Sequence, residues 1–445
     1  MAQLQETPSG VGPPLDGPAR SEPAQETHPA PATWRTSALA GMASYLDAGS
    51  IVALGAGLTL FQARLHLSSG AVGALTALGP NAVGCAIGAF IGGRLGDRLG
   101  RKRIYKYDLL LYAAGMLAMA LSVNTVMLFA GTIAVGVAVG ADVPTSLALV
   151  GENAPPRARG RLLGLTQVAW NLGPVVVLLL SFAFAPLGLL GVRLVFLHLF
   201  AVAMVVWGLR RRVAESARWQ SARSPDRPAP DARPRSLFSG AHLAALTWTT
   251  TIYLFWNLAA GTSGTFTPYM VETLHAGSRA AGLALSSAGF LIGLVGTVVL
   301  FMRFADRSHR TRRRMWAVGG VLQVGAYLLY LVLPFSVPVI CANIALFGVG
   351  SALAGEGFYK VFSQELFPTL LRSTAQGFTF GMARSVLGVW SLALVPLLAH
   401  TGIRPLSALL AFFLFVSAVV GWFFMPDTAG KSLEHIERER GGQPA

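Results

Sequence analysis

The sequence predicts an all-α integral membrane protein whose twelve transmembrane helices form two pseudo-symmetric bundles of six. Three observations support this: a composition suited to lipid, twelve apolar segments of spanning length, and positive charge in every second connection. Of the 445 residues, 53% are hydrophobic and only 12% are charged, and the mean hydropathy is +0.56. A soluble domain carries about 25% charged residues, so we expect lipid to be the main solvent of this chain.

Twelve segments have the length of about 20 apolar residues that a membrane-spanning helix needs. The first six are predicted at 37–61, 70–93, 106–123, 126–150, 162–186 and 188–209. The second six are predicted at 241–268, 280–302, 315–334, 337–362, 373–399 and 404–425. The polar stretch 210–240, rich in Arg, Pro, Ser and Asp, is expected to be a cytoplasmic linker between bundles at 37–209 and 241–425.

Both ends of the chain are expected to be cytoplasmic tails, at 1–36 and 426–445. The first is rich in Pro, Gly, Ala and Glu, which is typical of disorder, and lacks the apolar segment of a signal peptide. Arginines concentrate after spans 2, 4, 6 and 8, whereas the odd-numbered connections hold mainly Arg64, Arg279 and Arg404. Positive charge marks cytoplasmic loops, so this alternation predicts a multi-pass protein of the cell membrane with both termini in the cytoplasm.

The net charge of +15 could suggest a nucleic-acid partner, but the arginines lie between long apolar runs, so none is expected. Cys85 and Cys341 both fall within apolar spans and offer no disulfide framework or metal-ligand spacing. The sequence also lacks a nucleophile elbow, a Walker loop and a metal-binding pair of histidines. We therefore expect no enzyme activity, no ATP drive, no metal and no cofactor.

The two predicted bundles repeat each other at the even-numbered connections. Acidic and basic residues recur there at offsets between 209 and 213: Asp97-Arg98 with Asp306-Arg307, Glu152 and Arg159 with Glu365 and Arg372, and Glu215 with Asp427. Chance alone could produce one such pair in basic loops. Three pairs at nearly one offset indicate duplication of a six-span unit.

The residues of this repeat carry a resemblance to a known family. Gly93-Arg94-Leu95-Gly96-Asp97-Arg98-Leu99-Gly100-Arg101-Lys102 resembles the signature that major facilitator superfamily transporters carry between spans 2 and 3. Further matches, over about 37–435, resemble the sugar porter branch: Asp47-Ala48-Gly49, Glu152 with Arg159-Gly160, Gln167 with Gly173, Arg193, Glu215-Ser216-Ala217-Arg218-Trp219, Glu365-Leu366-Phe367-Pro368 with Arg372, and Pro426-Asp427-Thr428-Ala429-Gly430-Lys431-Ser432-Leu433-Glu434. Around Thr132, where that branch commonly has an arginine in span 4, this sequence has none.

The resemblance implies a monomeric secondary transporter that moves a small polar solute, a sugar or a polyol such as inositol, by alternating access with proton symport. Two alternatives stay open: a proton-coupled exporter of drugs or organic ions, and a non-transporting sensor of the same architecture. Its partners would be the lipid bilayer, the small-molecule substrate and protons.

The charged motifs are expected to form a cytoplasmic gate, although they could also serve only to orient the chain. A carboxylate there can interact with the positive N-terminal end of a neighbouring helix or pair with an arginine across the bundle interface. The gate candidates are Gly93, Asp97, Arg98, Gly100, Arg101, Glu152, Arg159, Glu215, Arg218, Asp306, Arg307, Glu365, Arg372 and Asp427.

Ionisable residues inside a membrane span are costly and usually functional. The proton-coupling candidates are Asp47, Asp142 and Glu356, of which Asp47 could instead belong to a permanent ion pair. Asp142 and Glu356 stand at nearly equivalent positions of the two halves, and either could bind substrate or a proton, or could pair with Lys360 or Arg384. The residues expected to line a substrate cavity offer amides, aromatic rings or a guanidinium: Gln167, Trp170, Asn171, Trp256, Asn257, Tyr359 and Arg384. For the aromatic residues alone, a lipid-facing position is the competing explanation.

Overall fold

The computed structural model describes residues 29–224, 233–273 and 278–440, and all of its regular elements are helices. The N-terminal bundle consists of α1 (Pro31–Leu65), α2 (Ser69–Leu78), α3 (Val83–Leu99), α4 (Arg101–Ala120), α5 (Thr125–Asn153), α6 (Arg159–Ala183), the short η1 (Ala185–Leu187) and α7 (Leu189–Arg210). The helix α8 (Ala217–Ala222) and the 3₁₀ turn η2 (Pro234–Phe238) lie between the bundles in sequence.

The C-terminal bundle follows the same order. It consists of α9 (Gly240–Thr273), α10 (Arg279–Gly296), the π-helical turn η3 (Thr297–Phe301), α11 (Met302–Phe304), α12 (His309–Val332), α13 (Val337–Leu353), α14 (Glu356–Glu365), α15 (Arg372–Thr401) and α16 (Ile403–Phe423), and α17 (Leu433–Arg440) ends the described chain. Three spans are broken helices: α2 with α3, α10 with η3 and α11, and α13 with α14. Each of the twelve predicted spans overlaps one of these helices or broken helices.

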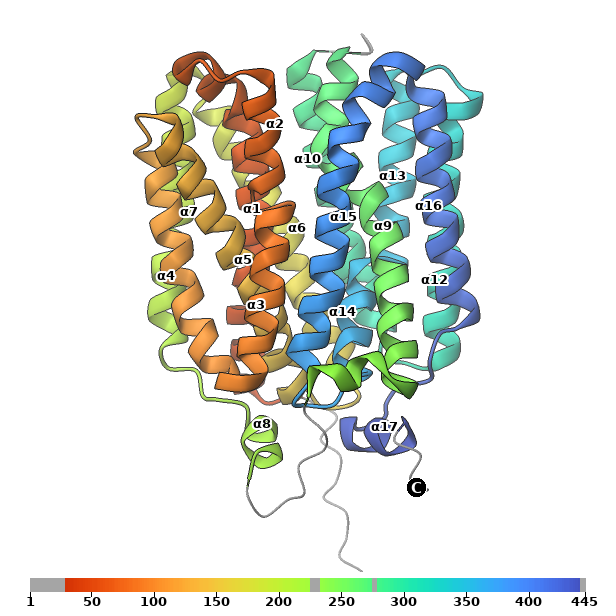
Figure 1. Ribbon diagram of the computed structural model, residues 1–445. Coiled ribbons are helices and arrows are strands. Elements are labelled where there is room, and N and C mark those ends of the chain that lie inside the picture. The colour runs from red at the N-terminus through yellow and green to blue at the C-terminus, as the bar shows by residue number, and fades with distance from the viewer. Residues whose placement is uncertain (1–28, 225–232, 274–277, 441–445) are drawn as a thin grey trace, which may run out of the picture.

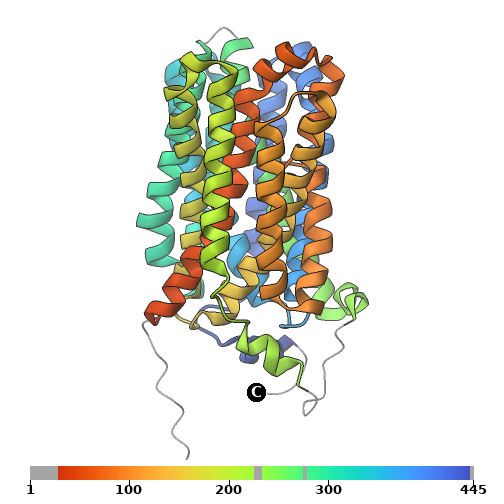
Figure 2. The same cartoon turned by 90° about the vertical axis from the view of Figure 1, so that its left-hand side faces the viewer.

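The two bundles stand side by side with roughly parallel helices, α1 to α7 on the left and α9 to α16 on the right (Figure 1). The even-numbered connections and the helices α8 and α17 lie at one end, which we call the basic end because of its arginines. Figure 2 shows that α1 also begins at this end. The arrangement follows the internal repeat, since an even number of spans returns the chain to the same end after each bundle.

The burial pattern is that of a protein surrounded by lipid. Large apolar side chains lie on the outside, with Val332 79% and Val126 77% exposed. In contrast, several of the largest fully buried side chains are arginines: Arg101, Arg159, Arg210, Arg312 and Arg372. Ten of the described helices, with the broken ones taken as continuous, are long and apolar enough to cross a bilayer, and α4 and α9 bring the number of spans to twelve.

Two glycines let the bundles approach each other closely near the basic end. A Cβ atom on Gly93 of α3 would collide with the Ser373 carbonyl oxygen of α15 and lie 3.1 Å from Gly377 Cα. Gly377 in turn packs against the carbonyl oxygen of Ala89. Small residues allow such backbone contact between membrane helices, so α3 and α15 form a tight seam between the bundles.

Candidate functional site

Asp97, at the end of α3, caps the first turn of α15 in the other bundle. Its carboxylate accepts hydrogen bonds from the backbone amides of Ser373 at 3.2 Å and Thr374 at 2.7 Å, and from the Thr374 hydroxyl at 2.6 Å. The first amides of a helix have no partner within the helix and attract negative charge. Asp97 therefore ties the two bundles together at the basic end.

Asp306 makes the equivalent contact in the opposite direction. Its carboxylate accepts from the backbone amides of Gly160 at 2.7 Å and Arg161 at 2.8 Å, at the start of α6 in the N-terminal bundle. Burial raises the pKa of the Asp306 carboxyl. Arg312 and these two amides act to lower the same pKa, but the effect of burial is larger. The two acids of the repeated motif thus form a reciprocal pair of caps between the bundles.

Two ion pairs cross the same interface. Arg159 Nη1 of α6 lies 3.0 Å from Glu365 Oε1 of α14, and Arg372 Nη1 of α15 lies 3.1 Å from Glu152 Oε1 of α5. All four side chains are at most 1% exposed. Removing one partner of a buried ion pair destabilises the protein to the extent that the remaining buried charge lacks another partner.

Each of these glutamates also has an arginine within its own bundle. Arg101 Nη2 lies 2.8 Å from Glu152 Oε1 and 3.0 Å from Asp97 Oδ1. Arg312 Nη1 lies 2.8 Å from Glu365 Oε2 and donates to the Thr428 hydroxyl at 3.0 Å. Arg312 was not among the predicted gate residues, although it follows Arg101 by 211 positions and the repeat could have identified it.

Glu215 and Arg218 attach the segment around α8 to the N-terminal bundle. The Glu215 carboxylate accepts from the backbone amides of Arg101 at 3.1 Å and Lys102 at 3.0 Å, and so caps α4. Gly100 makes the sharp turn before this cap with a φ of 97°, which favours glycine. Arg218 donates to the Glu152 carbonyl at 2.7 Å and pairs with Glu434 of α17 at 3.0 Å.

Three predicted gate residues lie outside this buried network. The Arg98 and Arg307 side chains are exposed, and the Arg307 guanidinium lies 4.4 Å from the centre of the Phe304 ring. The Asp427 carboxylate is 57% exposed, and His309 Nδ1 lies 3.9 Å from its Oδ1 atom. In lipid-facing proteins such loop charges are solvated at the membrane surface, which explains their position.

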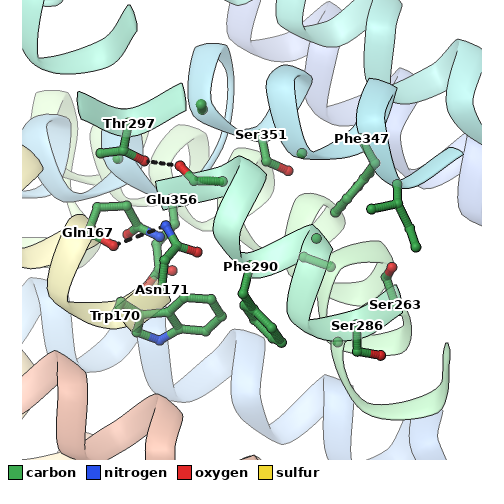
Figure 3. Close-up of a pocket in the computed structure, with 18 of the residues that line it drawn as sticks. Gln167, Trp170, Asn171, Ser263, Ser286, Phe290, Thr297, Phe347, Ser351 and Glu356 are labelled. Carbon is green, nitrogen blue, oxygen red and sulfur yellow. Dashed lines mark hydrogen bonds between the residues drawn. The ribbon is translucent and has the colours of Figure 1, made fainter. Parts of the chain in front are cut away.

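A cavity lies between the bundles, above the network at the basic end, and is drawn in Figure 3. It encloses about 810 Å³ of space unfilled by atoms, its mouth included, and is lined from α6 on one side and from α9, α10, α13 and α14 on the other. A smaller pocket adjoins it and adds residues of α1 and α15. Six lining residues are common to both pockets: Trp170, Trp256, Ala260, Gly264, Phe290 and Glu356.

Six of the seven predicted cavity residues line these pockets. They are Gln167, Trp170, Asn171, Trp256, Asn257 and Arg384. Figure 3 shows Gln167, Trp170 and Asn171 together on one side of the cavity, with the Trp170 ring next to Phe290. The lining also holds hydroxyl groups that the prediction missed: Ser263, Thr267, Ser286, Thr297 and Ser351.

Tyr359 is the exception among the predicted cavity residues. Its ring stacks on Tyr253 with a centroid distance of 3.9 Å, and its hydroxyl lies 2.7 Å from the Thr379 hydroxyl. The side chain is only 1% exposed and belongs to neither lining. Its polar group is already satisfied inside the C-terminal bundle, so it packs behind the cavity wall.

Several polar groups of the cavity wall are free to meet a solute. Trp256 Nε1, Asn257 Nδ2 and Ser286 Oγ are buried and have no hydrogen-bond partner among the described residues. Buried polar groups nearly always have a partner, so these groups are available to water or to a polar ligand in the cavity. Between the aromatic walls they suit a solute with hydroxyl groups and apolar C–H faces.

Glu356 brings a carboxylate into the cavity and is held by a lysine. Glu356 Oε1 lies 3.5 Å from Lys360 Nζ, one turn further along α14. Lys360 Nζ also donates to Gln167 Oε1 at 2.7 Å. This hydrogen bond joins α14 to α6 and therefore crosses between the bundles beside the cavity.

Asp47 has a cationic partner in the opposite bundle. Its Oδ2 atom lies 3.8 Å from Arg384 Nη2 of α15, and both side chains are at most 3% exposed. Arg384 Nη1 also donates to Asn81 Oδ1, in the break between α2 and α3, at 2.5 Å. Asp47 thus pairs with an arginine from α15, in a chain that has no arginine near Thr132.

Asp142 lies away from the cavity, contrary to its expected equivalence with Glu356. Its carboxylate pairs with Arg210 of α7 at 2.8 Å, inside the N-terminal bundle. Neither Lys360 nor Arg384, the partners considered for it, forms an ion pair with it in the described part of the chain. The reason is that α5 turns the Asp142 face towards α4 and α7.

Comparisons with known proteins agree with this architecture. The family model described as Major Facilitator Superfamily matches residues 37–392. The minor myo-inositol transporter IolF of Bacillus subtilis (strain 168) is 37% identical over 413 residues, which cover 91% of this chain and 93% of that protein. A probable 4-methylmuconolactone transporter of Cupriavidus pinatubonensis is 28% identical over 70% of this chain and 71% of its own.

Solved structures share the fold at low identity. The proton:xylose symporter XylE, bound to 6-bromo-6-deoxy-D-glucose, superimposes with a TM-score of 0.79 at 18% identity and covers 92% of this chain and 99% of its own. The human organic anion transporter MFSD10 gives a TM-score of 0.72 at 16% identity, covering 88% of this chain and 100% of its own. The predicted fold class, twelve transmembrane helices in two six-helix bundles, is confirmed, and the chain belongs to the Major Facilitator Superfamily.

Proposed function

We propose that this protein is a proton-coupled secondary transporter that moves a polyol or sugar, inositol first among them, across the cell membrane. The observation that carries the proposal is the cavity between the bundles, whose walls combine unpaired polar groups with tryptophan rings. The 37% identity with a protein named as a myo-inositol transporter, over nearly the whole length of both chains, supports the choice of inositol.

The basic end is assigned to the cytoplasm. Loops rich in arginine stay on the cytoplasmic side of a membrane, and the described helices α8 and α17 lie at the same end as those loops. With this orientation both termini are cytoplasmic. We take the functional unit to be a monomer, since both halves of the cavity wall come from one chain.

The buried network at the basic end is the cytoplasmic gate in this proposal. The caps at Asp97 and Asp306 and the ion pairs Arg159–Glu365 and Arg372–Glu152 hold the bundles together. Each interaction has one partner in each bundle, so rocking of the bundles breaks all four together. Closure at this end leaves substrate to enter from the other side, as alternating access requires.

Coupling to protons is assigned to Asp47. Its ion pair with Arg384 crosses the bundle interface at the level of the smaller pocket, which Arg384 lines. A proton on Asp47 removes the attraction that holds α1 to α15 at this point, because a neutral carboxyl group has no charge to offer Arg384. Proton binding can in this way promote the movement of one bundle against the other.

The test is uptake of labelled myo-inositol into proteoliposomes that contain the purified protein, with and without an inward proton gradient. The proposal expects accumulation above the equilibrium level only with the gradient. Absence of uptake in both conditions would remove inositol as substrate, and gradient-independent uptake would remove proton coupling. A panel of hexoses, pentoses and organic acids in the same vesicles then ranks the solutes by competition.

A further inference from the structure

A second group of buried charges lies inside the N-terminal bundle, apart from the cavity. Arg210 Nη1 of α7 lies 2.8 Å from Asp142 Oδ2 of α5 and 4.0 Å from Asp108 Oδ1 of α4. The same guanidinium donates to the Leu39 carbonyl of α1 at 3.2 Å and stacks on the Tyr105 ring at 3.7 Å. This group, which we call the Arg210 cluster, joins four helices.

The Arg210 cluster is closed off from solvent. The side chains of Arg210, Asp108 and Asp142 are 0%, 1% and 7% exposed. Asp108 Oδ1 accepts from the backbone amide of Leu109 at 2.5 Å, whereas Asp108 Oδ2 and Asp142 Oδ1 have no hydrogen-bond donor among the described residues. A buried carboxylate oxygen without a donor is costly, so two of them in one cluster need an explanation.

Charge balance supplies the explanation. Two carboxylates face a single guanidinium, so the cluster would carry a net negative charge if both were ionised. No other cation lies within 4.0 Å of either carboxylate in the part of the chain that the structure describes. Elsewhere in the interior the acids and bases are matched, as in Asp47 with Arg384 and Glu356 with Lys360.

We infer that Asp108 and Asp142 share one bound proton, and that the Arg210 cluster is a proton site separate from Asp47. The proton removes the excess charge, and either carboxyl group that carries it can donate to an oxygen that lacks a partner. Like charges on two carboxylates in close proximity cannot both be sustained in a dry interior.

The position of the cluster suits a proton that leaves towards the basic end. Leu39, which contacts Arg210, precedes Asp47 by eight residues on α1, so the cluster lies about 12 Å nearer the basic end. Loss of the proton would leave two repelling carboxylates between α4 and α5, beside the helix α1 that carries Asp47. This place in the cycle rests on the proposed function, whereas the bound proton itself does not.

The test needs no substrate. The purified full-length protein in lipid is examined at neutral pH for the infrared C=O stretch of a protonated, buried carboxyl group, with ¹³C labelling of aspartate to assign the band. We expect the band in the wild type and in Asp47→Asn, and its loss in both Asp108→Asn and Asp142→Asn. Either substitution leaves one carboxylate, which ionises beside Arg210 and holds no proton.

Several outcomes would overturn the inference. If the wild type lacks the C=O band of a protonated aspartate carboxyl group, the inference is wrong, and this result does not depend on whether any variant folds. A band that keeps its intensity in Asp108→Asn or in Asp142→Asn would place the proton on another group. The conservative variant Asp142→Glu keeps two carboxyl groups and is expected to keep a protonated one. Since no transport is measured, failure of inositol uptake would not affect this result.

Discussion

Arg384 Nη2 in the C-terminal bundle lies 3.8 Å from Asp47 Oδ2 in the N-terminal bundle, and both groups are buried. The pair connects α15 with α1 across the interface that must change during alternating access. Arg384 also holds Asn81, so one guanidinium contacts two segments of the opposite bundle. A change of charge at Asp47 therefore acts directly on the contact between bundles.

Removing the charge of Asp47 is predicted to uncouple transport. In Asp47→Asn, counterflow of labelled inositol should continue, while accumulation driven by a proton gradient should fall to the equilibrium level. Counterflow and gradient-driven uptake are measured in the same proteoliposomes. Asp427→Asn, which alters an exposed carboxylate, is the matched control and should accumulate inositol as the wild type does.

Breaking one ion pair of the gate is predicted to open the basic end. Arg159→Gln removes the contact of Glu365 with the opposite bundle, while Glu365 keeps Arg312 and the Thr428 hydroxyl in its own bundle. The loss should therefore fall below the about 3–5 kcal/mol that an unpaired buried charge costs. Spin labels on cysteines at positions 98 and 307, with Cys85 and Cys341 replaced, report the distance between the bundles. We expect this distance to lengthen in Arg159→Gln.

The charge reversal Arg159→Glu with Glu365→Arg serves as the control for that experiment. It restores an attractive pair, so the short distance should return at least in part. An unchanged distance in Arg159→Gln would show that this pair does not hold the gate closed.

Adding one methyl group at the seam between the bundles is predicted to destabilise the closed state. In Gly93→Ala the new Cβ meets the backbone of α15, which cannot move aside as a side chain can. Overpacking of this kind costs about 1–3 kcal/mol. Thermal unfolding in detergent should show a lower midpoint for Gly93→Ala. Gly55→Ala in α1, where a Cβ meets no atom within 4 Å, should leave the midpoint unchanged or slightly raised.

Loss of one cavity donor is predicted to weaken substrate binding modestly. Asn257 Nδ2 is buried and has no partner among the described residues, so it is available to a solute oxygen. A hydrogen bond contributes about 0.5–1.5 kcal/mol, so Asn257→Ala should raise the half-saturating concentration of inositol roughly 2- to 13-fold. Tyr359→Phe, behind the cavity wall, should leave it unchanged. Equal effects of both substitutions would contradict the proposed lining.

The sequence was sufficient for the fold and for much of the basic end. Spanning helices follow from runs of apolar residues, and the repeat at a nearly constant offset predicted two equivalent bundles. It also predicted that a motif carboxylate can meet a helix N-terminus, and the structure places Asp97 and Asp306 at such ends. These features follow from hydropathy along the chain and from the spacing of the repeated motifs, which the sequence alone reveals.

The partners of the buried charges could not be predicted in the same way. Arg384 stands 337 positions after Asp47, and Arg210 stands 68 after Asp142, so their contacts depend on how helices rotate within each bundle. Their position within apolar spans predicted both Asp142 and Glu356 as proton-coupling residues. In the structure Glu356 lines the cavity, whereas Asp142 faces Arg210 inside the N-terminal bundle. The rotation of α14 about its axis likewise determines whether the Tyr359 side chain faces the cavity or the packed interior, and in the structure it faces the interior.

The measurement that tests the central claim most directly is proton movement driven by substrate alone. Proteoliposomes with a trapped pH-sensitive dye receive an inward gradient of myo-inositol without any initial pH difference. The account predicts acidification of the interior by the wild type and none by Asp47→Asn, although both take up labelled inositol. Inositol uptake by the wild type without acidification would contradict proton coupling, and acidification by Asp47→Asn would contradict its assignment to Asp47.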